Sequence, residues 1–587
     1  MKKNVCIILM TIGALLLTGC DSTPRRDMDR LINMSVISPT PDNKGIVSEG
    51  SFNIFFKANS DIPYFSIKDG KDLLESYRKV RISDKSYINY TVDNNKVILK
   101  DDYNSSVTFD MATQKITFSD FDAFNNYSYQ YNGTLALFAN SNKDYISAED
   151  ITYTKGEEYV IDLSLYDKLG ICKYGDNFYI PLTTFNDLFL SVYTFSNLVY
   201  SPNGLFHLHD GVKFYTETPF GIEYTPIGRA YYRSKENSPT VSQEYATFNY
   251  QSICLNFDYT YGVKGLKGRD YETFDDYLSQ RGYKEDMLSG DVHKMDNAFA
   301  YALSYLNDFH TSYNTLSPLY PAGEGTLDRN NFNPAKILNE EGEEFLKKLR
   351  MMSQANLGLT IDTNSRTAFI AFDSFDSIDA ELLGKHEFTR EEILSNSPAL
   401  FACAYDIITT QYNDKIDYII VDMATNDGGS SDALIYILST LVGAFTLETQ
   451  NPYTDGHSIA HYLADINRDG KYDENDKSFR ELGKKIVFVN TSYAFSCGNA
   501  LPVLAKNNYP DDVITMGETT GGGACVLRTA YNAIGASYYM SGTMMLSERD
   551  EEGNLVGIEY GVDPDIPLKK EETINRKLVL LELFNNF

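Results

Sequence analysis

The chain has 587 residues, which is too long for one ordinary hydrophobic core and predicts several domains. It carries 52 lysine and arginine residues against 81 aspartate and glutamate residues, a formal net charge of −29. Binding to phosphate backbones needs a basic surface, so this charge argues against DNA or RNA as a partner.

The first residues have the layout of a bacterial secretory signal. Two lysines precede an apolar run, and the run ends in small residues before Cys20. The tetrad LTGC, which ends at Cys20, resembles the lipobox, in which the cysteine is acylated and becomes the mature N-terminus. A plain signal peptide is the alternative. No later segment reaches about 20 uninterrupted apolar residues. We therefore expect a signal peptide over residues 1–19 and an extracytoplasmic body that is held at the cell membrane only by lipid on Cys20.

The segments that follow differ in composition and period. Residues 20–48 are polar and contain several prolines, which is typical of a tether. Residues 49–240 contain short alternating runs typical of β-hairpins and could comprise two small modules. In residues 241–320 apolar residues recur three and four apart, which predicts helices leading to His310. Residues 321–587 alternate strand and helix patterns, which predicts an α/β core with a parallel sheet. The expected fold class is therefore multidomain α+β.

A turn that carries Ser496 joins a predicted buried strand to a predicted helix. A serine hydroxyl becomes a nucleophile when a base that titrates near neutrality removes its proton and a carboxylate supports that base. His310, upstream, and Glu559, downstream, could fill these two roles. In most proteins a serine in such a turn only caps the helix.

Acyl transfer also requires donors for the developing oxyanion. Gly428 and Gly429 follow another predicted strand, where glycines expose backbone N–H groups without side-chain obstruction. Either of them, together with the N–H of Cys497, could form an oxyanion hole.

Five segments resemble, in the same order, motifs of the C-terminal-processing and tricorn-type serine peptidases: NDFHTS, VDMATNDGG, SCGN, GETTGG and EYGVDPDI. The processing branch has a lysine just after the fourth motif, where this chain has Gly523-Ala524. The tricorn-type branch is therefore the closer one. The resemblance implies a ClpP/crotonase-like βαβ core, with Ser496 as nucleophile, His310 as base and Glu559 as its partner.

The chain departs from the family pattern at three positions near these motifs. Phe309 precedes the histidine, where the tricorn-type pattern has a serine. Ala424 stands where the Gly-Gly strand usually has an arginine, and Cys497 replaces an alanine after the nucleophile. Cys497 could itself be imagined as a nucleophile, but its position matches the oxyanion donor. We expect these changes to affect substrate positioning more than the chemistry.

Residues 465–476, DINRDGKYDEND, have the spacing of a calcium loop. Oxygen ligands recur at alternate positions, and Gly470 at the sixth position allows a sharp turn. A set of oxygen ligands suits calcium in a structural role and does not suit hydrolytic zinc. The alternative is an acidic hairpin tip. The expected ligands are Asp465, Asn467, Asp469, the Lys471 carbonyl, Asp473 and Asp476.

The sequence thus predicts a lipid-anchored extracytoplasmic serine peptidase that cleaves peptide or protein substrates by a Ser-His-Glu mechanism. One alternative is a catalytically inactive binding lipoprotein that keeps the peptidase scaffold. Another is an esterase that acts on surface polysaccharide with the same nucleophile.

Overall fold

The structure is a computed structural model, and it describes residues 27–587 except 82–84, 126–144, 193–195, 202, 210, 219–220, 233–238, 321–326, 354–356, 551 and 587. The predicted signal peptide and Cys20 lie outside the described residues. Within the described part of the chain, no helix is both long enough and apolar enough to cross a membrane.

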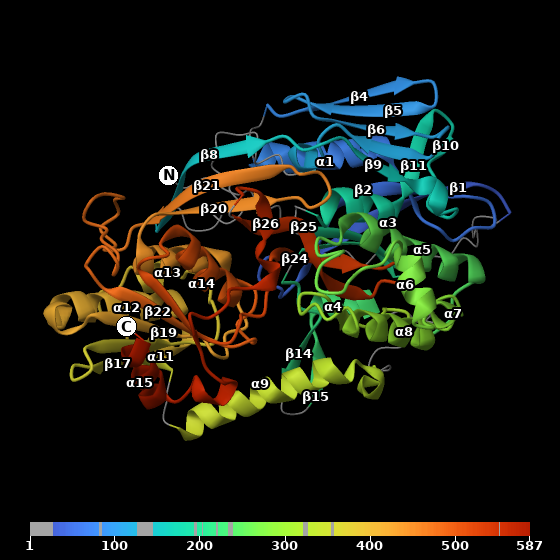
Figure 1. Cartoon of the computed structure of the whole chain (residues 1–587). Coiled ribbons are helices and arrows are strands. Elements are labelled where there is room, and N and C mark those ends of the chain that lie inside the picture. The colour runs from blue at the N-terminus through green and yellow to red at the C-terminus, as the bar shows by residue number, and fades with distance from the viewer. Residues whose placement is uncertain are drawn as a thin grey trace.

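A seven-stranded sheet forms much of the N-terminal region, in the order β10-β11-β3-β2-β1-β13-β12 (Figure 1). Its strands are β1 Arg30–Pro39, β2 Ile46–Phe56, β3 Tyr64–Ser66, β10 Cys172–Tyr174, β11 Asn177–Pro181, β12 Ser196–Ser201 and β13 Gly204–His209.

The strand β1 corrects one expectation. The whole strand falls within the segment predicted to be a tether, yet it pairs with β2 on one side and with β13 on the other. Ile32, Met34 and Val36 alternate with polar residues and pack on the core, which is the period of a half-buried strand.

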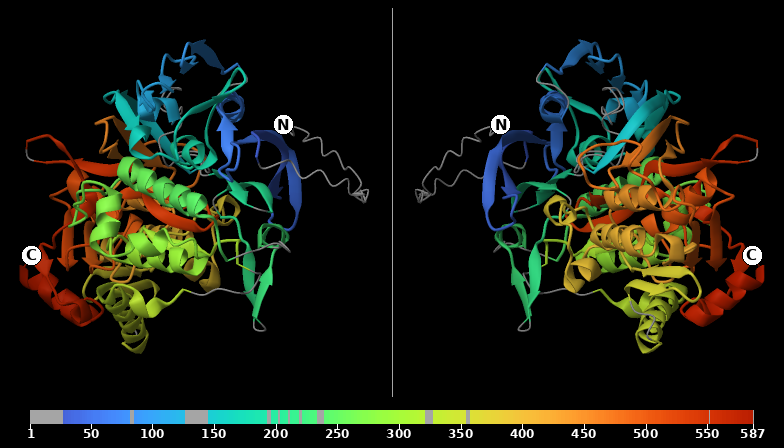
Figure 2. Two further views of the ribbon diagram at one scale, coloured as in Figure 1. Left: turned by 90° about the vertical axis from the view of Figure 1, so that its right-hand side faces the viewer. Right: turned by 90° about the vertical axis from the view of Figure 1, so that its left-hand side faces the viewer.

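A second N-terminal sheet has the order β4-β5-β6-β7-β9 and stands at the top of the molecule in the side views of Figure 2. With the sheet above, it confirms a β-rich N-terminal region. The region also contains a two-stranded hairpin, β14-β15, and the helices α1 to α4. The bounds of the second sheet, the hairpin and the helices are β4 Ile88–Asp93, β5 Lys96–Asp101, β6 Ser106–Asp110, β7 Lys115–Phe118, β9 Tyr159–Asp162, β14 Tyr215–Thr218, β15 Gly221–Tyr224, α1 Ile67–Arg81, α2 Phe121–Asn125, α3 Leu182–Phe185 and α4 Pro226–Tyr232.

The helical segment is confirmed. It consists of α5 Gln243–Thr260, α6 Phe274–Gln280, α7 Lys284–Met287 and α8 Val292–Ser304. His310 follows α8 and lies two residues before β16, Ser312–Thr315, which pairs with a strand from the C-terminal half of the chain. This pairing fixes the His310 segment against the C-terminal part.

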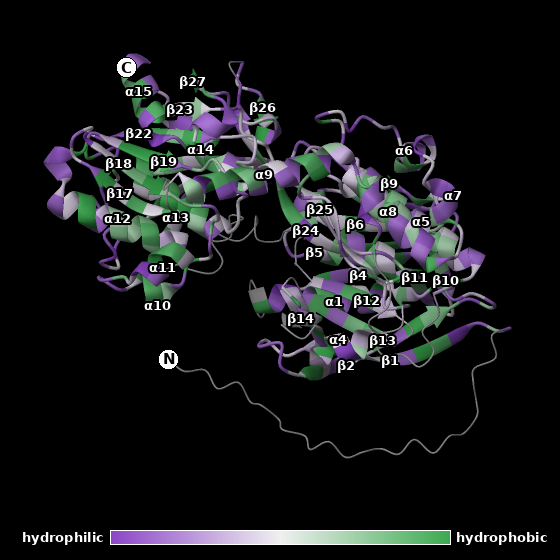
Figure 3. Ribbon diagram, turned by 90° about the horizontal axis from the view of Figure 1, so that it is seen from below, coloured by the Kyte–Doolittle hydropathy of each residue, from purple (hydrophilic) through white to green (hydrophobic). Residues whose placement is uncertain are grey.

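The predicted parallel sheet is present in the order β17-β18-β19-β22-β23-β27. All of its neighbouring pairs are parallel except β17 with β18. One face packs on α15, through Val579 and Leu583, and residues of the other face join the main core with α12, α13 and α14. The hydropathy colouring of Figure 3 shows these strands as an apolar layer. The bounds are β17 Gly358–Asp362, β18 Thr367–Ala371, β19 Tyr418–Asp422, β22 Lys485–Asn490, β23 Val513–Gly517, β27 Ile566–Pro567, α10 Ala380–Leu383, α11 Arg390–Ser395, α12 Ser397–Gln411, α13 Ser431–Val442, α14 Cys497–Asn508 and α15 Arg576–Asn586.

A further sheet joins parts of the chain that were predicted to be separate. Its main path is β16-β25-β20-β21-β8, and β24 and β26 also pair with β25. Because β8 belongs to the N-terminal region, residue 240 is not a clean structural boundary. The bounds are β8 Ile146–Thr154, β20 Phe445–Gln450, β21 His457–Ala464, β24 Cys525–Tyr531, β25 Ser537–Arg549 and β26 Leu555–Gly557.

The helix α9, Pro334–Met352, runs along the lower side of the molecule and lies at the junction between its two halves (Figures 1 and 3). Its N-cap is Asn333, whose side chain accepts a hydrogen bond from the Ala335 N–H, and Pro334 occupies the first turn. Only Leu346 and Arg350 of this helix are buried. Most of its surface therefore faces solvent or the cavity described below.

Candidate active site

Ser496 lies in a strained turn between β22 and α14. Its φ is 57° and its ψ is −123°, a conformation that a residue with a side chain adopts only under local constraint. The Ser496 N–H donates to the Gly522 carbonyl at 2.8 Å, which holds the turn against the GETTGG segment. The side chain does not cap α14. Ser496 therefore does not have the capping role that a serine at this position ordinarily has.

Ser496 and His310 line the same cavity, which has a volume of about 460 Å³. The structure thus brings together two side chains that the sequence places far apart. Gly429 also faces the cavity, as do aromatic and acidic side chains. The lining residues are Phe309, His310, Asn339, Glu340, Glu343, Asp427, Gly429, Tyr493, Phe495, Ser496 and Leu527.

The His310 side chain is buried, and its ring packs edge-on against Phe495 with 4.8 Å between ring centroids. Its Nδ1 is buried and has no hydrogen-bond partner among the residues that the structure describes. Burial lowers the pKa of His310, although the carboxylates of Asp308 and Glu559 act in the opposite direction. The neutral ring that results can accept a proton. Among the described residues no hydrogen bond joins His310 to Ser496, and catalytic hydrogen bonds are often long before substrate binds.

Glu559 is buried, but its two oxygens are engaged elsewhere. Oε1 accepts from Arg269 Nη1 at 2.9 Å, and Oε2 accepts from the N–H groups of Gly523 and Ala524 at 2.9 and 3.0 Å. In the described part of the chain no hydrogen bond connects Glu559 to His310. The orienting contact expected from the sequence is thus absent here, and Glu559 acts on His310 through its charge.

Asp308 and Arg269 support the His310 segment, and both escaped the sequence prediction. Asp308 accepts hydrogen bonds from the His310 N–H at 3.0 Å and from the Thr311 hydroxyl at 2.6 Å. Arg269 donates to the carbonyls of Leu306 and Asn307. Asp308 could have been found, because it belongs to the NDFHTS motif. Arg269 lies in an irregular loop, where no periodic pattern marks it.

The candidate oxyanion donors lie beside Ser496. The Gly428 N–H donates to Asn426 Oδ1 at 3.0 Å and is therefore occupied. Among the described residues the Gly429 N–H donates no hydrogen bond. Cys497 is the first residue of α14, so its N–H has no partner within the helix. A Cβ at Gly428 would lie 2.7 Å from Ser496 Cβ and 3.1 Å from the Cys497 nitrogen. The arrangement favours Gly429 and Cys497 as the donor pair.

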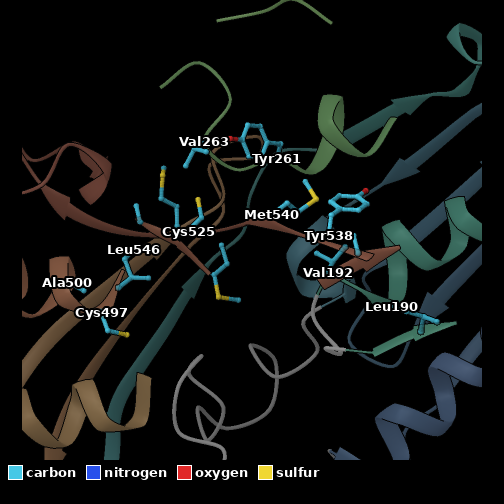
Figure 4. Packing of buried hydrophobic residues seen from close by; sticks show 14 of the residues in the cluster. Leu190, Val192, Tyr261, Val263, Cys497, Ala500, Cys525, Tyr538, Met540 and Leu546 are labelled. Atoms are coloured by element: carbon cyan, nitrogen blue, oxygen red, sulfur yellow. The ribbon is translucent and has the colours of Figure 1, made fainter. Parts of the chain in front are cut away.

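The Cys497 thiol is unsuited to be the nucleophile. Its Sγ donates to the Gly429 carbonyl at 3.2 Å, and burial raises the pKa of the thiol to about 12. Figure 4 shows Cys497 and Cys525 among packed apolar side chains. At neutral pH both therefore behave as small core residues.

The predicted calcium loop, residues 465–476, connects β21 to β22. The carboxylate of Asp465 accepts from the N–H groups of Asp469 and Gly470, and Asp476 Oδ1 accepts from those of Ile466 and Asn467. Burial, together with the nearby carboxylates of Asp476 and Asp469, raises the pKa of Asp465. Among the described residues no group of three or more His, Cys, Asp or Glu side chains is arranged to hold a metal ion. Calcium binding therefore stays a prediction for all six expected ligands, Lys471 and Asp473 included.

Residues 368–568 match the model of peptidase family S41. The match covers the strands of this sheet except β17, together with the Gly-Gly turn, Ser496 and Glu559, whereas His310 precedes it. The C-terminal core of this chain is therefore similar to peptidase family S41, as the motifs predicted.

Several solved structures resemble the chain at low identity. A candidate peptidase from Parabacteroides merdae ATCC 43184 is 15% identical over 58% of this chain and 96% of that chain, with a TM-score of 0.39. A lipoprotein from Streptococcus agalactiae is 12% identical over 60% and 99%, with a TM-score of 0.34. The tricorn protease is 10% identical over 95% of this chain and 63% of its own length, with a TM-score of 0.30. No curated protein sequence matches. Likeness at this level supports no conclusion about activity.

Proposed function

We propose that this protein is a lipid-anchored extracytoplasmic serine peptidase that cleaves peptide bonds in peptide or protein substrates. One observation carries the proposal: Ser496, in a strained turn that its side chain does not cap, shares a cavity with the buried His310. The similarity of the core to family S41 supports the same conclusion.

The reaction follows from the positions of these groups. Ser496 Oγ attacks the peptide carbonyl while His310 takes its proton, and the Gly429 and Cys497 N–H groups stabilise the oxyanion. As the C–N bond breaks, His310 returns the proton to the leaving amine. Water then attacks the acyl-enzyme ester with His310 again as base, which releases the acid and regenerates Ser496.

The carboxylates around His310 have a supporting role in this scheme. Asp308 holds the backbone of the His310 segment, and the charges of Asp308 and Glu559 stabilise the imidazolium that forms during proton transfer. Arg269 connects Glu559 to the chain just before Asp308. Asp308, Glu559 and Arg269 thus hold His310 in position, although no direct hydrogen bond joins Glu559 to His310 in the described residues.

A second candidate function is a binding lipoprotein without catalysis, and the engaged oxygens of Glu559 favour it. Incubation of the full chain and of its Ser496→Ala variant with a peptide library, read by mass spectrometry, separates the two functions. New peptide termini that appear only with the parent chain support the peptidase. Turnover of an acetyl ester without any peptide cleavage would favour the esterase.

The lipid anchor rests on the LTGC motif at Cys20. Mass spectrometry of the mature N-terminus from membranes should show an acylated Cys20. If the mature protein carries no lipid and is found in the medium, the protein is secreted through a plain signal peptide.

A further inference from the structure

We propose that the outer face of α9 is an interface at which two copies of this chain pair, with their α9 helices antiparallel about a two-fold axis at Phe345. Figure 1 shows α9 along the lower edge of the molecule. Its inner face lines the catalytic cavity through Asn339, Glu340 and Glu343. The inference concerns the opposite face and does not depend on the proposed peptidase function.

The outer face carries an apolar residue at every seventh position. Leu338, Phe345 and Met352 are 67%, 57% and 80% exposed. Seven residues complete almost two turns of a helix, so these three side chains form one stripe along α9. Single exposed apolar residues are ordinary on protein surfaces, but a stripe with this period is the pattern by which helices pair.

Charged residues interrupt the stripe, and their signs differ on the two sides of its centre. Glu341 precedes Phe345 by four residues, and Lys348 follows it by three. Both are exposed, and within the described part of the chain neither forms an ion pair. The surface ion pairs of α9 involve Glu340 and Lys347 instead. The stripe therefore presents one acidic and one basic group to a partner.

An antiparallel pairing matches this pattern to itself. With the axis at Phe345, the two Phe345 rings meet, and Leu338 lies opposite Met352 of the partner because both are seven residues from the axis. Glu341 and Lys348 of the partner lie within about 1.5 Å of the same height along the pair. Two ion pairs then flank the apolar centre. A parallel pairing would set like charges against one another at both positions, which is unfavourable.

A second copy fits this face better than a lipid surface does. The formal net charge of −29 opposes binding to anionic headgroups, on which membrane-surface helices depend in part. The helix also gains packing by pairing, because only Leu346 and Arg350 of its 19 residues are buried within the chain. A contact along one helix of roughly 28 Å is smaller than a standard interface, so we expect a dimer that dissociates at micromolar concentrations.

Sedimentation equilibrium at about 1–200 µM chain tests the pairing, in about 0.15 M salt to screen the net charge. The full chain carries Cys20→Ala, so that lipid does not associate the copies. Phe345→Glu places two carboxylates at the axis. Glu341→Lys and Lys348→Glu each set like charges against one another across the pair. Val80→Glu, at an exposed position of α1, is the matched control.

The parent chain should dimerise as its concentration rises, and Val80→Glu should do the same. Phe345→Glu should weaken the dimer at least about 30-fold, the scale of a lost interface hot spot. Each charge variant alone should weaken it about 10-fold. An equimolar mixture of Glu341→Lys and Lys348→Glu chains should dimerise as well as the parent, because each mixed pair regains both ion pairs.

A parent chain that stays monomeric up to about 200 µM overturns the proposal. A dimer that Phe345→Glu leaves intact uses another surface and overturns it as well, and a mixture that stays as weak as its two components contradicts the antiparallel register. If the monomer instead binds phosphatidylglycerol vesicles and Phe345→Glu abolishes that binding, the face is a membrane contact and the proposal is wrong.

Discussion

Arg269 donates a hydrogen bond to Glu559 at 2.9 Å, and both side chains are almost fully buried, at 2% and 1% exposure. The same guanidinium reaches the carbonyls of Leu306 and Asn307, next to Asp308. The pair thus joins the last catalytic motif to the segment that carries His310. Its loss should disturb both stability and the candidate active site.

The Arg269→Met variant should lose about 3–5 kcal/mol of unfolding free energy, because Glu559 would remain as a buried charge without its partner. Chemical denaturation measures the change. Arg549→Gln, at an exposed ion pair, should cost about 1 kcal/mol or less. Equal stability of the two variants would show that the buried pair does not hold the segment.

Gly428→Ala should slow the reaction of Ser496 with a fluorophosphonate by about 100-fold or more, the scale of a lost oxyanion donor. The new Cβ would meet Ser496 Cβ at 2.7 Å and push the Gly-Gly turn from the nucleophile. Gly553→Ala is the matched control, since its φ of 86° is similarly positive but its Cβ would meet nothing within 4 Å. If both variants react as fast as the parent chain, the turn has no part in the site.

The rate at which the fluorophosphonate labels the chain should fall only when the pH drops below 6.5, which is the ordinary pKa of histidine. Burial lowers the pKa of His310, so its neutral form persists below that pH, and protonation then removes the base. The pH dependence of the labelling rate gives the midpoint directly. A midpoint above 6.5 would contradict the dominance of burial at this histidine.

Calcium should raise the melting temperature of the full chain. At a free concentration of about 100 times its Kd, the ion adds about 2.7 kcal/mol to the stability of the folded state. Asp465→Asn should abolish the effect, whereas Glu474→Gln, in the same loop but not at a ligand position, should keep it. Identical melting with calcium and with a chelator would make the loop an acidic hairpin tip.

The sequence predicted the α/β core because β19 and β22 are continuous apolar runs buried on both faces. It also predicted that Ser496 and the Gly-Gly turn meet, because both follow the carboxyl ends of neighbouring parallel strands. Local patterns of this kind carry the strongest signal in a single sequence.

Contacts between distant segments could not be predicted in the same way. The pairing of β8 with β21 and the engagement of Glu559 by Arg269 depend on tertiary packing, and no local period marks them. Arg350 reaches Asp422 from a helix that lies before the matched family segment. Position 424, where the motif usually carries an arginine, is alanine here, and Ala424 packs with Leu346 of α9.

Labelling of the purified chain by a fluorophosphonate probe, compared with Ser496→Ala and His310→Ala, tests directly whether Ser496 is a nucleophile that His310 activates. We expect labelling of the parent chain, none in Ser496→Ala, and a loss of about 100-fold or more in His310→Ala, as expected when a general base is removed. A folded parent chain that resists the probe with and without calcium, or a His310→Ala variant that labels at the parent rate, would contradict this activation.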